Sequence, residues 1–292
     1  PAIKAVADIQ YLPSKIAFGS CSNQNKPQPI LDTVVAKNPD LFIYLGDNIY
    51  GDTEDMEVLA QKYRKLENKK EFQNLRANTA VLSTWDDHDY GRNNAGAEYE
   101  LKEVTRDLAL SFMEVPIGDP RWQREGLYGA YDFGTNGKMT KVILLDNRYF
   151  ASGKKTDNPE LLGQEQLAWL ETTLRESEAD LHILVSGIQI ISEEHRWEKW
   201  ADYPKTRACL LREIAETQTP TILLSGDRHI HEISILQDWP GKFPLPEITS
   251  SGLTHSWDEF PGETHRHREG AVFTGLGDGR LCSTAAGSML CS

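Results

Sequence analysis

The stretch LFIYLGDNIYGDT, residues 41–53, decides the fold class. Its first five residues are apolar without a break, which is typical of a short strand buried on both faces. The strand ends at Gly46-Asp47, a turn that leaves a carboxylate just beyond its carboxyl end. Residues 55–67 then carry apolar side chains at helical spacing. The local pattern is therefore strand, polar turn, helix.

The same pattern recurs along the chain. Apolar segments at 16–18, 80–84 and 221–224 also run into polar turns that contain Gly, Asp, Cys or His. Further helices are expected at 28–37, 98–114, 163–176 and 206–217, and further strands at 128–133, 141–145, 181–185, 232–236 and 247–250. The Thr-Asn-Gly of 135–137 is a hairpin signal. Alternating strands and helices predict one α/β domain with mixed sheets and no internal repeat.

Composition excludes several classes of protein. The chain has 292 residues, of which 39% are hydrophobic and 26% charged, and a mean hydropathy of −0.50. These values exclude disordered, collagen-like and coiled-coil proteins, and no apolar run approaches the roughly 20 residues of a membrane helix. The net charge of −13 disfavours non-specific nucleic-acid binding. It allows a small phosphorylated substrate, since bound cations can dominate the field of a local site.

Cysteines and the first residues say little about compartment. Cys21, Cys209, Cys282 and Cys291 form no C-x-x-C pair and are too few for a disulfide scaffold. Residues 1–10 contain no signal-peptide pattern. Either the protein is not exported, or a signal has already been removed, and the sequence leaves both cases open.

Side chains that bind metals follow several of the expected strands. Cys21, Asp47, Asp87-His88 and Asp227-Arg228-His229 each come directly after one. In open α/β sheets, ligands gather beyond the carboxyl ends of strands, so residues far apart in sequence can meet there. Carboxylates suit hard cations, whereas thiolate and phenolate suit a trivalent or transition metal.

Each of these residues also has a simpler interpretation. An Asp after a strand and a Gly is common in turns, and a lone Cys is often a small buried apolar residue. The run Asp86-Asp87-His88-Asp89 could be a solvated loop, although three carboxylates in four positions repel one another without a nearby cation. The turn around His229 could simply be exposed. His255, in TSSGLTHSW, could edge a pocket.

Other catalytic signatures are missing from the sequence. It contains no G-x-S-x-G elbow, no H-E-x-x-H helix and no G-x-x-x-x-G-K-[ST] phosphate loop. A sugar-binding module is suggested only by the seven tryptophans, among them Trp197 and Trp200, which more often pack a core or a lid.

Six blocks, in order, resemble the PhoD-like (alkaline phosphatase D) branch of the metallophosphoesterases. They are GSCSN, LFIYLGDNIYGDT, TWDDHDYGRNNAG, VILLDNRYF, VSGIQ and LLSGDRHIHEIS. The resemblance runs from about Ile16 to Phe273, and WDDHD and SGDRH are its most specific parts. It implies a four-layer α/β/β/α sandwich with mixed sheets and a dinuclear metal site at the strand ends.

The resemblance also implies a role for each motif residue. Cys21 stands in place of the usual Asp-x-His pair, Asp47 would bridge both metals, and Tyr50 would add a phenolate to the first. The family further implies iron(III) at the thiolate–phenolate position and calcium at the carboxylate position. The remaining assignments are Asp87 and Asp227 as ligands of the second metal, His229 as a ligand of the first, and His88 as the histidine that faces the phosphate.

These groups predict a metal-dependent phosphoric ester hydrolase. Two cations sharing Asp47 would lower the pKa of a bridging water, and the resulting hydroxide would attack phosphorus in line. His88 would stabilise or protonate the leaving group. Arg148 and Asn93 are candidate substrate contacts, although Arg148 could equally hold a structural ion pair. The alternatives are a hydrolase specific for phospholipids or other phosphodiesters, or a non-catalytic metal-binding protein.

The predicted organisation is an N-terminal extension at 1–14, a PhoD-like domain at 15–274 and an atypical tail at 275–292. The tail has little apolar periodicity, where family members usually add a closing strand after a segment like GAVFTG. Its GLGDG lacks the spacing of a phosphate loop, so we expect a flexible, altered end without a role in the chemistry. The family further implies a periplasmic or secreted location. Natural substrate, preference for mono- or diesters and oligomeric state stay open.

Overall fold

The first sheet carries the strands that open the chain. The computed structural model describes residues 3–135, 137–257, 261–267 and 272–274. Strands β1 (Ile16–Gly19), β2 (Leu41–Leu45) and β3 (Ala80–Thr84) form a three-stranded sheet in the order β1-β2-β3, and both pairings are parallel. Every residue of β2 and β3 is buried, as the unbroken apolar run of β2 predicts for that strand. Their carboxyl ends therefore lie side by side.

The second sheet is larger and mixed. It has seven strands in the order β10-β8-β9-β7-β6-β5-β4. β5, β6, β7 and β9 run parallel to one another, whereas β4, β8 and β10 pair antiparallel. The strands are β4 (Gly129–Thr135), β5 (Lys138–Leu144), β6 (Leu181–Ser186), β7 (Thr221–Ser225), β8 (Ile230–Ile235), β9 (Pro246–Ser250) and β10 (Val272–Thr274). The hairpin expected at 135–137 joins β4 to β5.

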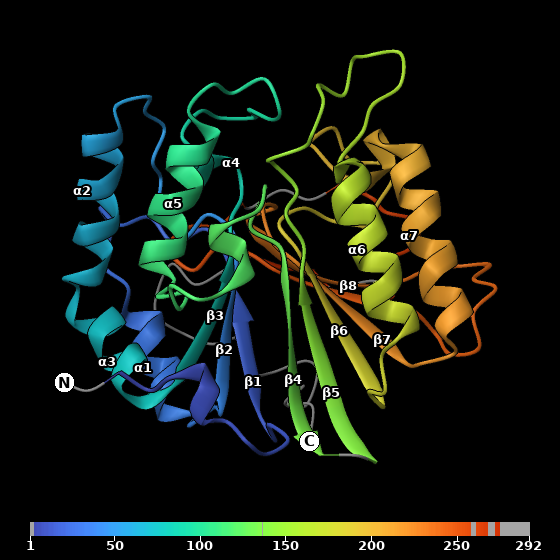
Figure 1. Cartoon of the computed structure of the whole chain (residues 1–292), viewed down its shortest axis with the longest axis horizontal. Helices are drawn as coiled ribbons and strands as arrows, with labels where there is room; N and C mark the ends of the chain where they lie inside the picture. Colours follow the sequence, from blue (N-terminus) through green and yellow to red (C-terminus); the bar gives the residue numbers. More distant parts are fainter. Residues whose placement is uncertain (1–2, 136, 258–260, 268–271, 275–292) are drawn as a thin grey trace.

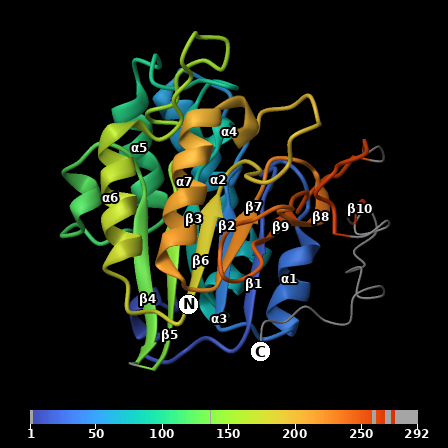
Figure 2. The same ribbon diagram turned by 90° about the vertical axis from the view of Figure 1, so that its right-hand side faces the viewer.

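The two sheets pack face to face between two layers of helices (Figures 1 and 2). Alternate residues of β2 divide between the two faces: Ile43 packs toward the second sheet, and Phe42 and Tyr44 pack toward the helices. The helices on the first sheet are α1 (Pro29–Ala36), α2 (Met56–Glu67), α3 (Lys70–Asn78) and α5 (Lys102–Phe112), and those on the second are α6 (Gly163–Arg175) and α7 (Pro204–Thr217). The predicted α/β/β/α sandwich with mixed sheets is confirmed.

Apolar side chains fill the space between the sheets. The inner layer contains Leu41, Ile43, Leu45 and Leu82 from the first sheet and Val142, Leu144, Ile183, Val185 and Leu224 from the second. Burying side chains of this size contributes about 1.5–3 kcal/mol each. This apolar layer holds the two sheets at a fixed relative position, and with them the loops that leave their carboxyl ends.

Helix boundaries follow from local hydrogen bonds. The Asp55 side chain accepts the backbone N–H groups of Glu57 and Val58 and so caps α2. The helix expected at 98–114 begins only at Lys102, because the Glu98 carboxylate accepts the Gly96 N–H and stabilises a turn there. The chain passes through short 3-10 turns at Val6–Asp8, Pro120–Trp122 and Trp200–Asp202.

Two helices lie where the sequence pattern predicted none. α3 (Lys70–Asn78) is mostly polar and buries only Phe72, Leu75 and Arg76, too short an apolar stripe to stand out. The acidic turn after β3 is a helical turn, α4 (Asp87–Tyr90), which Figure 1 shows above the tips of β2 and β3.

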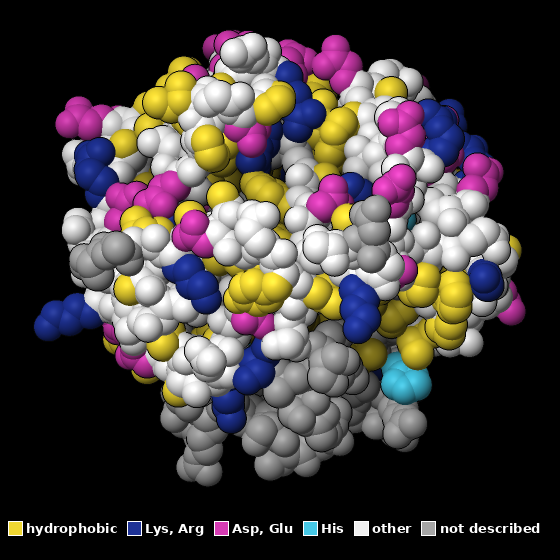
Figure 3. Space-filling view, turned by 60° about the horizontal axis from the view of Figure 1, so that its bottom comes forward, with side chains coloured by type: hydrophobic (Ala, Val, Ile, Leu, Met, Phe, Trp, Pro, Cys, Tyr) yellow, Lys and Arg dark blue, Asp and Glu magenta, His cyan; other side chains and the backbone are white. Residues whose placement is uncertain are grey.

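Part of the predicted organisation lies outside the described residues. Residues 275–292, with Cys282 and Cys291, are not described, so the tail stays a prediction; β10 lies within the preceding GAVFTG and pairs with β8. Within the described ranges, no helix has the length and apolar character needed to span a bilayer. Basic and acidic side chains are interspersed on the face that Figure 3 shows.

Candidate metal centre

Loops from both sheets converge at one place. Cys21 follows β1, Asp47 follows β2, Asp86 to His88 follow β3, and Asp227 and His229 follow β7. A bridge between Ser20 and Ser251 joins the loops after β1 and β9. Three groups of side chains each have ligand atoms within 4.8 Å of one another: Cys21, Asp47 and His229; Asp47, Asp87 and His88; and Asp47, Asp86 and Asp227. Asp47 belongs to all three groups, and its role as a bridging ligand stays a prediction.

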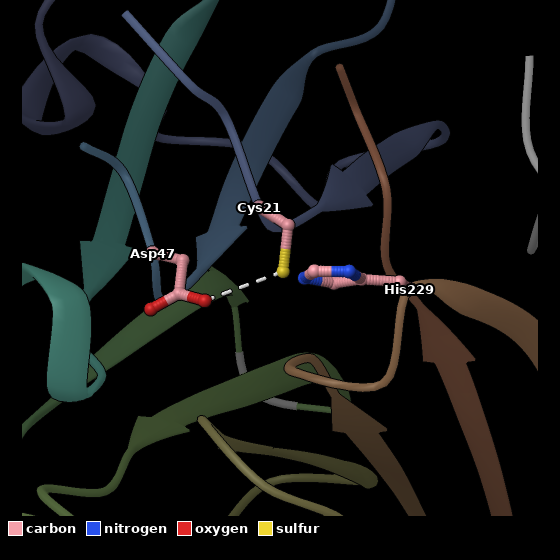
Figure 4. A group of neighbouring side chains, drawn as sticks. All are labelled: Cys21, Asp47 and His229. Carbon is pink, nitrogen blue, oxygen red and sulfur yellow. Dashed lines mark hydrogen bonds between the residues drawn. The ribbon is translucent and has the colours of Figure 1, made fainter. Parts of the chain in front are cut away.

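The first group combines a thiol, a carboxylate and an imidazole (Figure 4). The Cys21 thiol donates to Asp47 Oδ2 over 3.3 Å, and Ser251 Oγ lies 3.1 Å from the sulfur. The second Asp47 oxygen points away from Cys21, and the edge of the His229 ring faces the sulfur. This geometry leaves one Asp47 oxygen for each side of the centre.

Tyr50 lies beside this first group. Its hydroxyl is 3.2 Å from His229 Nε2 and 3.1 Å from His255 Nε2. His255 thus lies in the centre, where the sequence indicated only a possible pocket edge. Ser251, which accepts the His229 backbone N–H at 2.7 Å, carried no sequence signal at all.

Carboxylates dominate the other two groups. Among the described residues, Asp47 Oδ1, Asp86 Oδ2 and Asp87 Oδ1 are buried oxygens without a hydrogen-bond partner. The other Asp87 oxygen accepts the backbone N–H of Asn94 at 2.9 Å. Buried carboxylates are normally satisfied, so three unpartnered oxygens on members of these groups fit the binding of cations.

The backbone at the centre adopts conformations that cost energy. Cys21, Asp47, Asp227 and His229 have positive φ angles of 61°, 49°, 63° and 53°. Non-glycine residues in this region cost of the order of 1–3 kcal/mol each and concentrate at functional sites. Gly46, with φ of 97°, allows the chain to turn: an added Cβ would lie 2.7 Å from Cβ of Asp86.

Comparison with known protein families identifies one that matches the chain. The family model of PhoD-like phosphatases matches residues 16–270. The chain belongs to this family. No curated protein sequence matches the chain.

Solved structures of similar fold agree with the PhoD-like assignment. The structure titled "Structure of PhoD" has a TM-score of 0.68 and 20% identity over 87% of this chain. The chain spans 58% of the length of that structure. GAP50 of Plasmodium, described as the anchor in the inner membrane complex, has a TM-score of 0.57 and 12% identity over 90% of this chain and 78% of its own. A dimetal phosphatase from Danio rerio has a TM-score of 0.55 and 12% identity over 83% and 89%. At these identities the likenesses show a shared fold.

Without a cation, burial disfavours charge on the acids of this PhoD-like centre. Burial and the neighbouring carboxylates raise the pKa of Asp47 well above its usual range, and burial raises that of Asp86 although Arg148 opposes the shift. Burial and Asp87 raise the pKa of Asp227 to about 6. Burial, His255 and His88 lower the pKa of His229 to about 3, which keeps the imidazole neutral and its lone pair free for a metal.

The donor set fits two different cations. Cys21, Tyr50 and His229 offer sulfur, phenol oxygen and nitrogen on one side of Asp47, and burial raises the pKa of both the thiol and the phenol, so only a strongly polarising metal would deprotonate them. Asp86, Asp87 and Asp227 would offer only oxygen on the other side, which suits a hard cation. The residues present therefore fit a dinuclear site.

His88 lies at the edge of the centre, and its contact with substrate stays a prediction. Its Nδ1 is 2.7 Å from Asp52 Oδ1, and its ring packs against Tyr50 with 4.2 Å between centroids. Burial lowers the pKa of His88, but the hydrogen bond to Asp52 and the charges of Asp47 and Asp87 outweigh it and raise the pKa to about 10. Sequence reasoning did not single out Asp52, although its Gly-Asp in GDT repeats the signal that revealed Asp47.

Arg148 and Asn93, the two candidate substrate contacts, differ in their surroundings. The Arg148 guanidinium is buried and pairs with Asp86 at 2.6 Å and Glu198 at 2.7 Å, which is the structural ion pair named as its alternative. Asn93 is exposed on the loop after α4, where its amide oxygen accepts from the Asn94 side chain. Asp86 was part of the predicted acidic run but was not assigned as a ligand, since two adjacent aspartates cannot be ranked by sequence alone.

Proposed function

We propose that the chain is a metal-dependent phosphoric ester hydrolase. Family membership supports phosphoester chemistry, and the observation that carries the proposal is the buried, unpartnered carboxylate oxygens of Asp47, Asp86 and Asp87, which belong to groups that share Asp47. The proposed ligands of the first metal are Cys21, Asp47, Tyr50 and His229, and those of the second are Asp47, Asp86, Asp87 and Asp227. Following the resemblance, we assign iron(III) to the first position and calcium to the second, and a small phosphorylated molecule as substrate.

Each of the proposed site residues would have a distinct role in the reaction. When bound, the two cations would activate water and neutralise charge on the phosphate oxygens. Asp47 would hold both cations because it is the shared member of the groups. His88, oriented by Asp52, would donate a proton to the leaving oxygen. Arg148 would hold Asp86 in position, and Asn93 would meet the substrate from its exposed loop.

The remaining proposals follow from the family. The hydrolase domain would span residues 15–274, and the protein would act in the periplasm or outside the cell. Phosphomonoesters and phosphodiesters are both candidate substrates, since the metal centre alone does not select between them.

Reconstitution tests the proposal. Protein loaded with iron and calcium and dialysed against plain buffer should retain two ions per chain, measured by elemental analysis, and should release phosphate or phenol from phenyl phosphate or diphenyl phosphate. Asp47→Asn should lose at least one ion, whereas Asp157→Asn, an exposed control, should lose none. A folded protein that retains no metal would overturn the proposal. Retained metal without turnover on either ester would favour the non-catalytic alternative.

A further inference from the structure

A buried arginine next to the metal centre has no side-chain hydrogen bond or ion pair among the described residues. Arg228 lies between Asp227 and His229 in the chain and is only 3% exposed. Within the described ranges, its side chain makes no hydrogen bond or ion pair, and its Nε is shielded from solvent. Arginine is almost never fully buried unless it is paired, because an uncompensated buried charge is costly. This guanidinium therefore has its donors free for an anion.

Asp227 and two further acids, Glu232 and Glu263, act on Arg228 through their charge, and the latter two are hydrogen-bonded to other groups. Glu232 receives Arg266 Nε at 3.2 Å and Gln189 Nε2 at 3.4 Å. Glu263 accepts the backbone N–H groups of Glu193 and Glu194 at 3.2 and 3.1 Å. Both carboxylates act on Arg228 through their charge alone.

Aromatic rings connect Arg228 with the metal centre. Trp257 is 46% exposed and stacks on His229, with 5.7 Å between centroids and 22° between planes. Trp197 follows at 6.1 Å from Trp257, and the Arg228 guanidinium carbon lies 4.0 Å from the Trp197 ring centroid. A continuous line of contacts thus leads from a proposed metal ligand, across two indoles, to the free guanidinium.

A second unpartnered group lies on the same side. His195 is 5% exposed, neither of its ring nitrogens has a hydrogen-bond partner among the described residues, and its ring is 6.0 Å from that of Trp197. Burial, Arg228 and Lys199 lower its pKa to about 3, so it is a neutral imidazole with one N–H to donate. Arg228 and His195 together offer hydrogen-bond donors to an anion.

We propose that Trp257, Trp197, Arg228 and His195 form a subsite for the leaving group of the substrate, selecting a planar leaving group that carries its own negative charge. This inference rests on the proposed function, since it places the scissile phosphate on the metal centre. The exposed Trp257 ring beside His229 would stack the planar part. Arg228, one ring further out, would pair with a carboxylate, sulfate or second phosphate on that group. Reaching the guanidinium requires a rotamer change of the half-buried Trp197, a common adjustment on binding.

A matched pair of ligands tests the subsite. Phenyl phosphate and 4-carboxyphenyl phosphate differ only in the remote carboxylate, and so do the corresponding phosphonates, which are not hydrolysed. The variants are Arg228→Gln, Arg228→Lys and Trp257→Ala, with Arg196→Gln as the control, because Arg196 also lies over the Trp197 ring but is exposed. Turnover is measured by phosphate release and phosphonate affinity by calorimetry, both on metal-loaded protein.

The expected results separate the residues. Arg228→Gln should weaken the carboxylated ligands at least about tenfold, in KM and in Kd, while changing the unsubstituted ligands less than about twofold. Trp257→Ala should weaken both members of each pair about threefold to tenfold. Arg228→Lys should restore part of the preference for the carboxylated ligands, which would show that the subsite recognises charge. Arg196→Gln should leave KM and Kd unchanged for all ligands.

Other outcomes overturn the inference. Equal effects of Arg228→Gln on both ligands, or no effect on either, would show that Arg228 is structural and that water fills its surroundings. If wild-type protein hydrolyses neither ester, the proposed function fails. The phosphonate affinities still decide the subsite in that case, since discrimination lost with Arg228 supports it and absent discrimination rejects it.

Discussion

Buried acids occur in two regions of this molecule that differ in their hydrogen bonds. At the metal centre, Asp47, Asp86 and Asp87 each leave a buried oxygen without a partner in the described part of the chain. Just behind it, Asp146 accepts four donors, namely Trp85 Nε1 and the backbone N–H groups of Leu127, Arg148 and Tyr149, at 2.8–3.0 Å. Residue type and burial are the same, so the unpartnered oxygens distinguish the proposed cation ligands from acids that hold loops.

The satisfied acids also explain why the centre keeps its shape. Asp89 accepts the backbone N–H groups of Asn48 and Ile49, after β2, and that of Asp86, after β3, at 3.1–3.2 Å. Glu247, on β9, accepts those of Ile190 and Ile191 at 2.7 and 2.8 Å. These hydrogen bonds tie together loops that repulsion among the metal ligands would otherwise separate.

The largest expected effect comes from Asp47→Asn. Turnover should fall by at least about a thousandfold, because the shared metal ligand is lost. The metal-free variant should nevertheless unfold at a higher temperature than metal-free wild type, since it removes a carboxyl group whose ionisation burial and the neighbouring carboxylates make costly. Phosphate release and thermal unfolding in chelator check both parts. Lower stability in the metal-free state would contradict the distinction between the two kinds of acid.

Asp146→Asn should behave in the opposite way. The amide can accept with only one oxygen, so at least one backbone N–H loses its acceptor, and we expect the free energy of unfolding to fall by about 2–4 kcal/mol. Urea denaturation of metal-free protein measures the loss. Metal content of the folded variant should stay at two ions per chain, and a variant that lost metal without losing stability would place Asp146 with the ligands.

The sequence predicts the scaffold and most of the centre because both depend on local pattern. An unbroken apolar run located β2, and the polar residues after β1, β2 and β7 located Cys21, Asp47 and Asp227. The surroundings of two adjacent residues, by contrast, depend on contacts with residues that are distant in the sequence. Asp86 and Asp87 are the same residue type. Only the helical turn of α4 and the ion pair between Asp86 and Arg148 distinguish their surroundings.

Residues of the centre that are distant in the sequence could not be predicted for a related reason. His255 and Ser251 reach the centre through the β8–β9 hairpin and the bridge to Ser20, contacts that span more than 200 residues. Arg228 was read only as part of the GDRH block. That its guanidinium has no ion pair among the described residues follows from the hydrogen bonds of Glu232 and Glu263 to other groups, which no spacing rule predicts.

A smaller effect concerns the pH dependence of stability. Burial raises the pKa of Glu247 from 4.5 to about 7 despite its two hydrogen bonds. The folded state therefore binds more protons than the unfolded state between these values, and Glu247 makes stability fall as pH rises from about 4.5 to 7. Glu247→Gln should reduce the difference in unfolding free energy between pH 5 and pH 7 by about 1–3 kcal/mol in metal-free protein. An unchanged difference in urea denaturation would assign the slope to other groups.

The smallest effect is expected from Asp52→Asn, which tests whether an exposed acid can serve the centre without binding metal. Asp52 contacts His88 Nδ1 at 2.7 Å and belongs to no ligand group among the described residues. The asparagine keeps an oxygen for the ring but removes the charge, so kcat should fall about tenfold, equivalent to 1.4 kcal/mol, while KM and metal content stay unchanged. The decisive control is a double-mutant cycle with His88→Ala. If Asp52 acts only by orienting His88, its substitution costs nothing further once the imidazole is gone, whereas additive losses would mean that Asp52 acts on the metal centre by another route.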